Sequence, residues 1–219
     1  MRWRPKWLQP GSDFRSELRR RFPRLRGVVI APRRWLRSYR WRRYHRRVSV
    51  ADRLLLEQTI LPALRADVER GPVLFVGVAW YTAGYPALFP PGGLVTVDAD
   101  PGQARYGSER HHVVDVLRVG TLFSPRTFSA IVCNGVFGYG VDTEQAIVAA
   151  LDAFRLVLEP GGALVVGWND LEGRRPPELE PLARRSGFLP SSGAGLSSWR
   201  VAIGGPTKHV YDVYRCPIP

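Results

Sequence analysis

Cysteine and long apolar runs are scarce in this chain of 219 residues. The two cysteines, Cys133 and Cys216, are far apart and lack the spacing of metal ligands, so we expect neither a disulfide framework nor a metal site. No apolar run reaches the length of a membrane span, and residues 1–12 lack the apolar core of a signal peptide. These absences predict a chain without a transmembrane segment, located in the reducing cytoplasm or peripherally at a membrane surface.

Acidic residues are almost missing from the start of the chain. Residues 1–47 hold 17 of the 32 lysines and arginines but only Asp13 and Glu17 as acids, whereas residues 48–219 hold 15 basic and 17 acidic side chains. The net charge of +13 therefore belongs to the N-terminal segment, and the remainder is nearly neutral. We predict a basic Arg- and Trp-rich extension over 1–47 and one α/β domain over 48–219.

The basic extension admits three interpretations. Only two of the basic residues are lysines, and codon bias would explain the choice of arginine but not its clustering. Arginine interspersed with Trp and Tyr is typical of surfaces that bind RNA or DNA, and also of segments that lie on anionic lipid. We expect a polyanionic partner or a phosphate-bearing substrate, and the sequence does not choose between RNA and lipid.

From residue 71 onward, short apolar runs alternate with helical or turn segments. The runs expected to form strands are 73–77, 94–98, 111–114, 129–134 and 162–168. Strands that are buried on both faces and separated by helices indicate a parallel sheet with right-handed crossovers. The stretch "WRVAIGGPTKHVYDVYRC" predicts instead an antiparallel hairpin that closes one edge of the sheet.

Two helices are predicted beside these strands. The first should begin at Ser49, a good cap, and Pro62 should kink or restart it. The second has an apolar stripe over 147–158 and should stop at Pro160 and Gly161.

Ligands of parallel sheets bind at the carboxyl ends of the strands, so the residues after each run are candidates for a site. Gly77 follows the first run, and Asp98 ends the second run 21 residues later. This spacing places a carboxylate on the ribose hydroxyls of a nucleoside. The other residues at strand ends are Asp115, Asn134, Trp168, Asn169 and Asp170.

In five ordered pieces, the sequence resembles the class I S-adenosylmethionine-dependent methyltransferases. The pieces are "VLFVG", "LVTVDADP", "HHVVDVL", "FSAIVCNGVFGYGVDTEQAIVAALDAFRLVLEPGGALVVGW" and the terminal hairpin, and "LVLEPGGALVV" is the most recognisable. The resemblance implies an α/β three-layer sandwich with helices on both faces of a mostly parallel seven-stranded sheet. The implied strand order is 3-2-1-4-5-7-6, with the last strand antiparallel, and the implied cofactor is S-adenosylmethionine.

The resemblance also assigns roles to residues at the strand ends. Gly77 and the amides after it would lie against the methionine part of the cofactor, Asp98 would bind the ribose hydroxyls, and Asp115 would accept from the adenine amino group. The whole cofactor set is Gly77, Val78, Ala79, Trp80, Asp98, Ala99, Asp115, Val116 and Asn134. The candidate catalytic residues are Asn134, Asp142 and Asp170, followed by His111 and His112 as bases, and the acceptor-pocket candidates are Tyr139 and Trp168.

The glycine loop departs from the family pattern. Phe75 stands where the family usually has an acid, and Ala79 and Tyr81 replace the second and third glycines. Tyr81 cannot occupy the space of a glycine unless the start of the following helix moves, so the loop is either rebuilt or closed to the cofactor. Because Asp98 and Asp115 are both present, we favour retained cofactor binding.

These features predict methyl transfer to a small or medium-sized metabolite, such as a sugar, a nucleotide-linked compound or a natural-product intermediate. Methyl transfer from a sulfonium needs mainly alignment and exclusion of water. Two alternatives stay open: an RNA methyltransferase that uses the basic extension, and a non-catalytic binding or scaffold protein with a degenerate cofactor loop. His209, in the last strand, is interpreted as structural.

Overall fold

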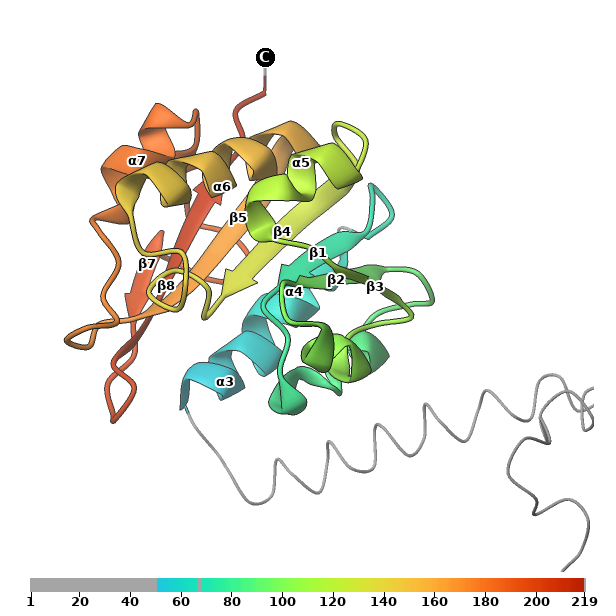
Figure 1. Ribbon diagram of the computed structural model, residues 1–219, viewed down its shortest axis with the longest axis horizontal. Helices are drawn as coiled ribbons and strands as arrows, with labels where there is room; N and C mark the ends of the chain where they lie inside the picture. Colours follow the sequence, from blue (N-terminus) through green and yellow to red (C-terminus); the bar gives the residue numbers. More distant parts are fainter. Residues whose placement is uncertain (1–50, 67, 219) are drawn as a thin grey trace, which may run out of the picture.

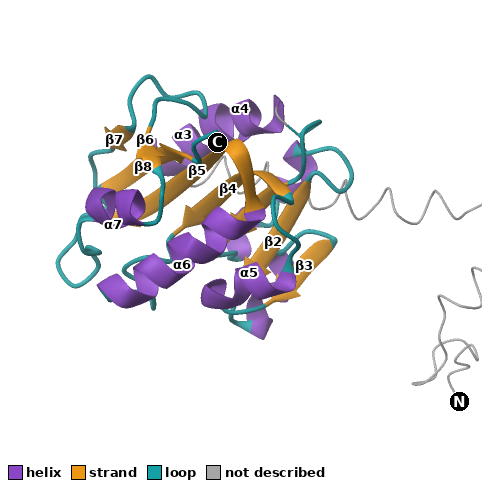
Figure 2. Cartoon of the chain, turned by 90° about the horizontal axis from the view of Figure 1, so that it is seen from above, coloured by secondary structure: helices purple, strands orange, loops and turns teal. Residues whose placement is uncertain are grey.

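The computed structural model describes residues 51–66 and 68–218, which form three layers around a central sheet (Figure 1). One face of the sheet is covered by α3 (Ala51–Leu55), the π-helical turn η3 (Leu56–Ile60) and α4 (Leu61–Ala66). The other is covered by α5 (Val119–Leu122), α6 (Glu144–Val157) and α7 (Leu179–Arg185). Figure 2 shows these two groups on opposite sides of the strands. The predicted three-layer α/β sandwich is confirmed.

The sheet follows the order β3-β2-β1-β4-β5-β8-β6, with β7 also paired to β8. Its strands are β1 (Val73–Val76), β2 (Leu94–Asp98), β3 (Arg110–Val113), β4 (Phe128–Asn134), β5 (Leu158–Asn169), β6 (Leu189–Pro190), β7 (Arg200–Ala202) and β8 (His209–Arg215). The first five strands pair in parallel, and β8 pairs antiparallel to β5. The carboxyl ends of β1 to β5 therefore meet at one edge of the sheet, next to the start of β8.

The far edge of the sheet differs from the expected seven strands, because the sixth position is divided. β6 and β7 are two short strands that both pair antiparallel with β8. The chain between them makes a tight turn in which Gly193 and Leu196 bond to each other and Ala194 has φ of +51°. Pro190 also cannot donate to a ladder, which limits β6 to an edge. The predicted hairpin is confirmed as β7 and β8, and the strand order is otherwise as expected.

Two element boundaries also correct the predictions. α6 begins at the Thr143 cap, whose hydroxyl accepts from the Ala146 amide, but it ends at Val157 rather than at Pro160. Leu158 already has extended dihedrals and pairs with Phe128 of β4, so β5 begins there. β3 is partly exposed along its length rather than buried on both faces, because it is the edge strand.

The first helix continues through Pro62, where a kink or a restart was expected, and it contains a π turn just before that residue. Proline has no N–H and its ring crowds the carbonyl four residues earlier, and the π turn η3 comes directly before it. Leu56, Ile60 and Leu64 of this helix are fully buried against the sheet. A π turn places residues five apart on the same side, and both Asp52 and Glu57 are buried. Ser49 and the predicted extension over 1–47 lie outside the described residues, and no helix of the described chain is long and apolar enough to cross a membrane.

Candidate functional site

Gly77 brings the end of β1 against the end of β4. Its φ is +86°, which side chains rarely adopt, and a Cβ there would lie 2.7 Å from the Asn134 carbonyl oxygen and 2.9 Å from Val136 Cγ2. Only glycine fits this close approach. The structure therefore places two of the predicted cofactor residues, Gly77 and Asn134, side by side.

The loop after Gly77 is rebuilt without a helix. Ala79 is extended, and the Thr82 hydroxyl both accepts from the Ala79 amide and donates to the Ala79 carbonyl. Only the short 3-10 turns η4 (Trp80–Thr82) and η5 (Tyr85–Leu88) connect β1 to β2. Tyr81 points its ring at the Arg53 guanidinium, 4.0 Å away, and the Trp80 side chain is 55% exposed. No α-helix starts in this loop. Tyr81, which stands where the family has its third glycine, therefore does not have to fit between a helix and a strand.

Asp98 and Asp115 lie at the ends of adjacent strands, as predicted. The half-buried Asp98 carboxylate accepts from the Val78 amide at one oxygen and from the Asp100 amide at the other, both at 2.9 Å. Asp115 is exposed and caps the 3-10 turn η7 (Val116–Arg118). A carboxylate offers about four acceptor sites, so both carboxylates can accept further hydrogen bonds. The flanking candidates differ, since Ala99 is exposed and Val116 is buried.

A group of polar side chains lies beside Gly77, where β4, β5 and β8 meet. We call Tyr139, Asn134, Asn169, His209 and Asp52 the strand-end cluster. Asn169 Nδ2 donates to the Tyr139 hydroxyl at 2.7 Å, and Asn169 Oδ1 lies 2.5 Å from His209 Nδ1. His209 Nε2 lies 3.1 Å from Asn134 Oδ1, and Asp52 Oδ2 is 4.0 Å from His209 Nδ1. Contacts thus run unbroken from the exposed Tyr139 to the buried Asp52.

Burial keeps His209 uncharged. Loss of solvation lowers the pKa of His209 to about 4, against the attraction of Asp52, so the imidazole is neutral at pH 7. A neutral imidazole donates from one nitrogen and accepts at the other. Because Asn169 already donates to Tyr139, its oxygen accepts from His209 Nδ1–H. His209 Nε2 is then the unprotonated nitrogen, so it bonds to Asn134 only if that amide turns its Nδ2, rather than its Oδ1, toward the ring.

Gly167 has no side chain, and the strand-end cluster occupies the space that a side chain would need. A Cβ on Gly167 would lie 1.9 Å from Asn134 Oδ1 and 2.8 Å from His209 Nε2. Gly167→Ala should therefore displace both side chains and lower the free energy of unfolding by about 1–3 kcal/mol. Urea denaturation checks this, with Gly204→Ala as the control, because a Cβ on Gly204 meets nothing within 4 Å. Equal effects of the two substitutions would contradict the packing described here.

Glu57 is a second buried acid close to the cluster. Burial raises the pKa of Glu57 to about 7, although a hydrogen bond with Tyr85 and the charge of Arg53 act in the opposite direction. The carboxyl is only 5% exposed and lies on the side of the helix that faces the sheet. It therefore changes its protonation state near neutral pH.

Glu57→Gln should alter how stability depends on pH. The folded pKa of Glu57 is about 7 against an ordinary value of 4.5, so the native state holds a proton that the unfolded chain releases. The stability that this bound proton contributes to the native state is fully present below pH 4.5 and is lost as the pH rises through 7. Relative to wild type, Glu57→Gln should gain up to about 3 kcal/mol between pH 4.5 and pH 8. Urea unfolding at both pH values measures this difference, and a difference independent of pH would refute the assignment.

Two predicted catalytic acids do not join the strand-end cluster. Asp142 is exposed and accepts from the Gly140 amide at 3.1 Å, which is a local turn contact. Asp170 pairs with Arg175 in the loop after β5. Their catalytic roles stay predictions, whereas Asn134 and Tyr139 are members of the cluster.

The two candidate histidines lie on β3, which is separated from β4 by the two strands β2 and β1. His111 Nδ1 is 3.0 Å from the Thr96 hydroxyl, and burial lowers the pKa of His111. His112 packs edge-on against Phe123. Neither contacts a member of the strand-end cluster in these interactions.

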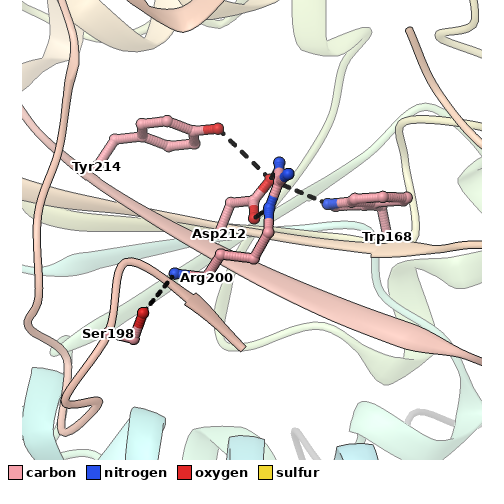
Figure 3. Close-up of polar contacts among 5 residues, drawn as sticks. All are labelled: Trp168, Ser198, Arg200, Asp212 and Tyr214. Atoms are coloured by element: carbon pink, nitrogen blue, oxygen red, sulfur yellow. Dashed lines mark hydrogen bonds and ion pairs between the residues drawn. The ribbon is translucent and has the colours of Figure 1, made fainter. Parts of the chain in front are cut away.

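Trp168 belongs to the opposite face of the sheet. Its Nε1 donates at 3.0 Å to Asp212, a carboxylate with no exposed surface that also accepts two hydrogen bonds from Arg200 and one from Tyr214 (Figure 3). Trp168 is 9% exposed and packs in the core beneath α6 and α7. This position gives Trp168 a structural role, and its place in an acceptor pocket stays a prediction.

Three buried polar residues near the site were not among the predicted site residues: His209, Asp52 and Glu57. Of these three, His209 was interpreted from the sequence as structural. One signal was available in the sequence. Leu56 lies on the buried stripe of the helix, with Asp52 one turn before it and Glu57 directly after it. Acids close to such a stripe are rarely buried without a partner.

The described chain has the fold of the class I S-adenosylmethionine-dependent methyltransferases. It is similar to the N-methyltransferase NodS from Bradyrhizobium japonicum WM9, with a TM-score of 0.53, 17% identity, and coverage of 89% of this chain and 99% of NodS. The complex of NodS with S-adenosyl-L-homocysteine is similar with a TM-score of 0.51, 19% identity, and coverage of 81% and 98%. The PH0226 protein from Pyrococcus horikoshii OT3 is similar with a TM-score of 0.56, 17% identity, and coverage of 80% and 98%.

At these identities the likeness establishes the fold alone. No protein-family model and no curated protein matches the sequence. Among the described residues, no group of three or more His, Cys, Asp or Glu side chains is arranged to hold a metal ion.

Proposed function

We propose that this protein is an S-adenosylmethionine-dependent methyltransferase that acts on a small or medium-sized metabolite, such as a sugar, a nucleotide-linked compound or a natural-product intermediate. One observation carries the proposal. Gly77, Asp98 and Asp115 follow three adjacent parallel strands of a sheet with methyltransferase topology, at the edge where such sheets bind ligands. NodS, which has the same fold, binds S-adenosyl-L-homocysteine.

The residues present fit the cofactor chemically. Asp98 and Asp115 are acceptors, and the ribose hydroxyls and the adenine amino group are donors. The two amides bonded to Asp98 leave acceptor capacity on each of its oxygens. Gly77 keeps the end of β1 free of a side chain, and the exposed Trp80 offers an aromatic surface beside it. When bound, S-adenosylmethionine supplies a methyl group that is already activated by the sulfonium charge.

The protein's own contribution is alignment and exclusion of water. Asn134 lies directly against Gly77, so it stands between the cofactor residues and the rest of the strand-end cluster. The neutral His209 holds the Asn134 and Asn169 side chains at a fixed spacing. Tyr139 is 43% exposed and gives the cluster its solvent-facing end.

Isothermal titration calorimetry with S-adenosylmethionine and S-adenosylhomocysteine tests the proposal on the full chain. Binding of both compounds is the expected result. Failure of both to bind at millimolar concentration would overturn it and would favour the non-catalytic alternative. An RNA methyltransferase would depend on residues 1–47, which lie outside the described residues. The two cysteines are free and buried, which suits the reducing cytoplasm that we propose as the location.

A further inference from the structure

We propose that the strand-end cluster, together with Glu57, is the acceptor site and that it takes a positively charged amine, which the enzyme methylates on nitrogen. This inference rests on the proposed function. It names the substrate class from the chemistry of the side chains that lie beside Gly77.

The cluster lies next to the place where the methyl donor would bind. The Asn134 carbonyl closes against Gly77, and Asn134 pairs with Gly167 in the neighbouring strand. Gly167 in turn pairs with Tyr211, and Asn169 pairs with His209. These residues form a continuous row along the sheet edge from the cofactor loop to the cluster. A ligand in the cluster is therefore adjacent to the methionine end of the cofactor site.

The cluster is rich in groups that attract a cation. Asp52 is 9% exposed, and its Oδ1 has no hydrogen-bond partner among the described residues, while its Oδ2 is 4.0 Å from His209. A carboxylate oxygen that is buried without a donor costs free energy until a ligand supplies one. Glu57 adds a second buried carboxyl. An ammonium group supplies both the missing donor and the positive charge.

Two buried acids, Asp52 and Glu57, lie close to one arginine at the buried end of the site. Arg53 is the cation that acts on both Glu57 and His209. The second guanidinium near the cluster, Arg174, lies 4.5 Å from the Tyr139 ring at the exposed end, away from Asp52.

The contacts of the cluster give it an exposed and a buried end. Tyr139 is exposed, Asn134 and Asn169 are half-buried, and His209 and Asp52 are buried. An acceptor that enters from solvent meets Tyr139 first and reaches Asp52 last. The oxygens of Asn134 and Asn169 lie between these ends, and each has a second acceptor position that an amine can use.

The chemistry balances with the residues present. The ammonium nitrogen gives one proton to the Asp52 carboxylate, which leaves a neutral amine with a lone pair. That lone pair forms the new N–C bond while the C–S bond breaks, and the electron pair of the broken bond stays on sulfur. The methylated product leaves as an ammonium ion, and Asp52 returns its proton to solvent.

Matched pairs of compounds test the charge preference. We would measure binding of 2-phenylethylamine against 2-phenylethanol, and of glucosamine against glucose, by calorimetry on the full chain saturated with S-adenosylhomocysteine. At least one amine should bind at least 10-fold tighter than its alcohol. Alcohols that bind as well as the amines, or amines that do not bind, would overturn the inference. If S-adenosylhomocysteine itself does not bind, the proposed function fails as well, so the two failures are distinguishable.

Substitutions then locate the site. Asp52→Asn should weaken amine binding at least 10-fold and leave S-adenosylhomocysteine binding unchanged, and Glu57→Gln provides a second variant if Asp52→Asn does not fold. Asp152→Asn is the control, because Asp152 is an exposed acid of α6 on the opposite face. Unchanged amine affinity in both site variants would place the amine elsewhere and refute the assignment.

Discussion

Asp98→Ala is expected to weaken binding of S-adenosylhomocysteine by about 100-fold. Each hydrogen bond from a ribose hydroxyl to a carboxylate contributes about 1.5–3 kcal/mol, and in the proposed cofactor site the substitution would remove the acceptor for both hydroxyls. Alanine also releases the Val78 and Asp100 amides, which Asp98 holds at 2.9 Å. The loop after Gly77 therefore loses its anchor together with the ligand contact. Calorimetry with S-adenosylhomocysteine measures the change directly.

Asp100→Ala is the matched control for this effect. Asp100 is exposed and accepts from the Gly102 amide at 2.7 Å, so its loss removes a turn cap in the same segment. We expect Asp100→Ala to cost about 1 kcal/mol of stability and to leave the affinity within a factor of two. Asp98→Asn should fall between wild type and alanine, because it keeps one acceptor oxygen. An Asp98→Ala protein that binds as tightly as Asp100→Ala would remove Asp98 from the cofactor site.

The fold was predictable because its pattern is local and strong. The runs 73–77 and 94–97 are apolar apart from Thr96, which indicates burial on both faces, and the structure has strands there. The divided sixth strand was not predictable. β6 and β7 have two and three residues, and so short a stretch carries no periodicity. Their pairing depends on β8, which comes later in the chain than either strand.

The positions of candidate site residues were predictable where they follow from strand ends. Asp98 and Asn134 are the last residues of β2 and β4, and the rule that ligands bind at carboxyl ends locates both. His209 and Asp52 were not predicted as site residues. His209 is the first residue of β8 and Asp52 is the second residue of α3, so neither follows the carboxyl end of a parallel strand. Their approach to Asn169 depends on the antiparallel register of β8 and on how α3 crosses the sheet. Neither can be read from residue types at a given spacing.

For Trp168, the sequence could not predict on which face of the sheet the side chain lies. Trp168 and Asn169 are consecutive at the end of β5, so their side chains point to opposite faces. The sequence places both at the site edge but does not say which face holds the ligand. The structure puts Asn169 with His209, and Trp168 with Asp212 beneath α6 and α7.

Arg200→Met is expected to lower the free energy of unfolding by about 3 kcal/mol, because it leaves the Asp212 carboxylate buried and uncompensated. Asp212 has no exposed surface, and Arg200 donates to it from Nε at 2.6 Å and from a terminal nitrogen at 2.8 Å (Figure 3). The Trp168 indole and the Tyr214 hydroxyl also donate to it, but both are neutral. Urea denaturation with a constant m-value measures the loss.

Two further variants separate charge burial from the loss of a side chain. Arg184→Met removes the exposed partner of Glu180, a pair at 2.9 Å one helical turn apart, and should cost only about 0.3–0.5 kcal/mol. The double variant Arg200→Met with Asp212→Leu removes both buried charges and should be more stable than Arg200→Met alone. If Arg200→Met costs no more than Arg184→Met, or if the double variant recovers nothing, Asp212 does not depend on Arg200 for its burial. From the most to the least stable, the expected order is wild type, the double variant and Arg200→Met. The order follows from the free-energy cost of an unpaired carboxylate inside the sheet.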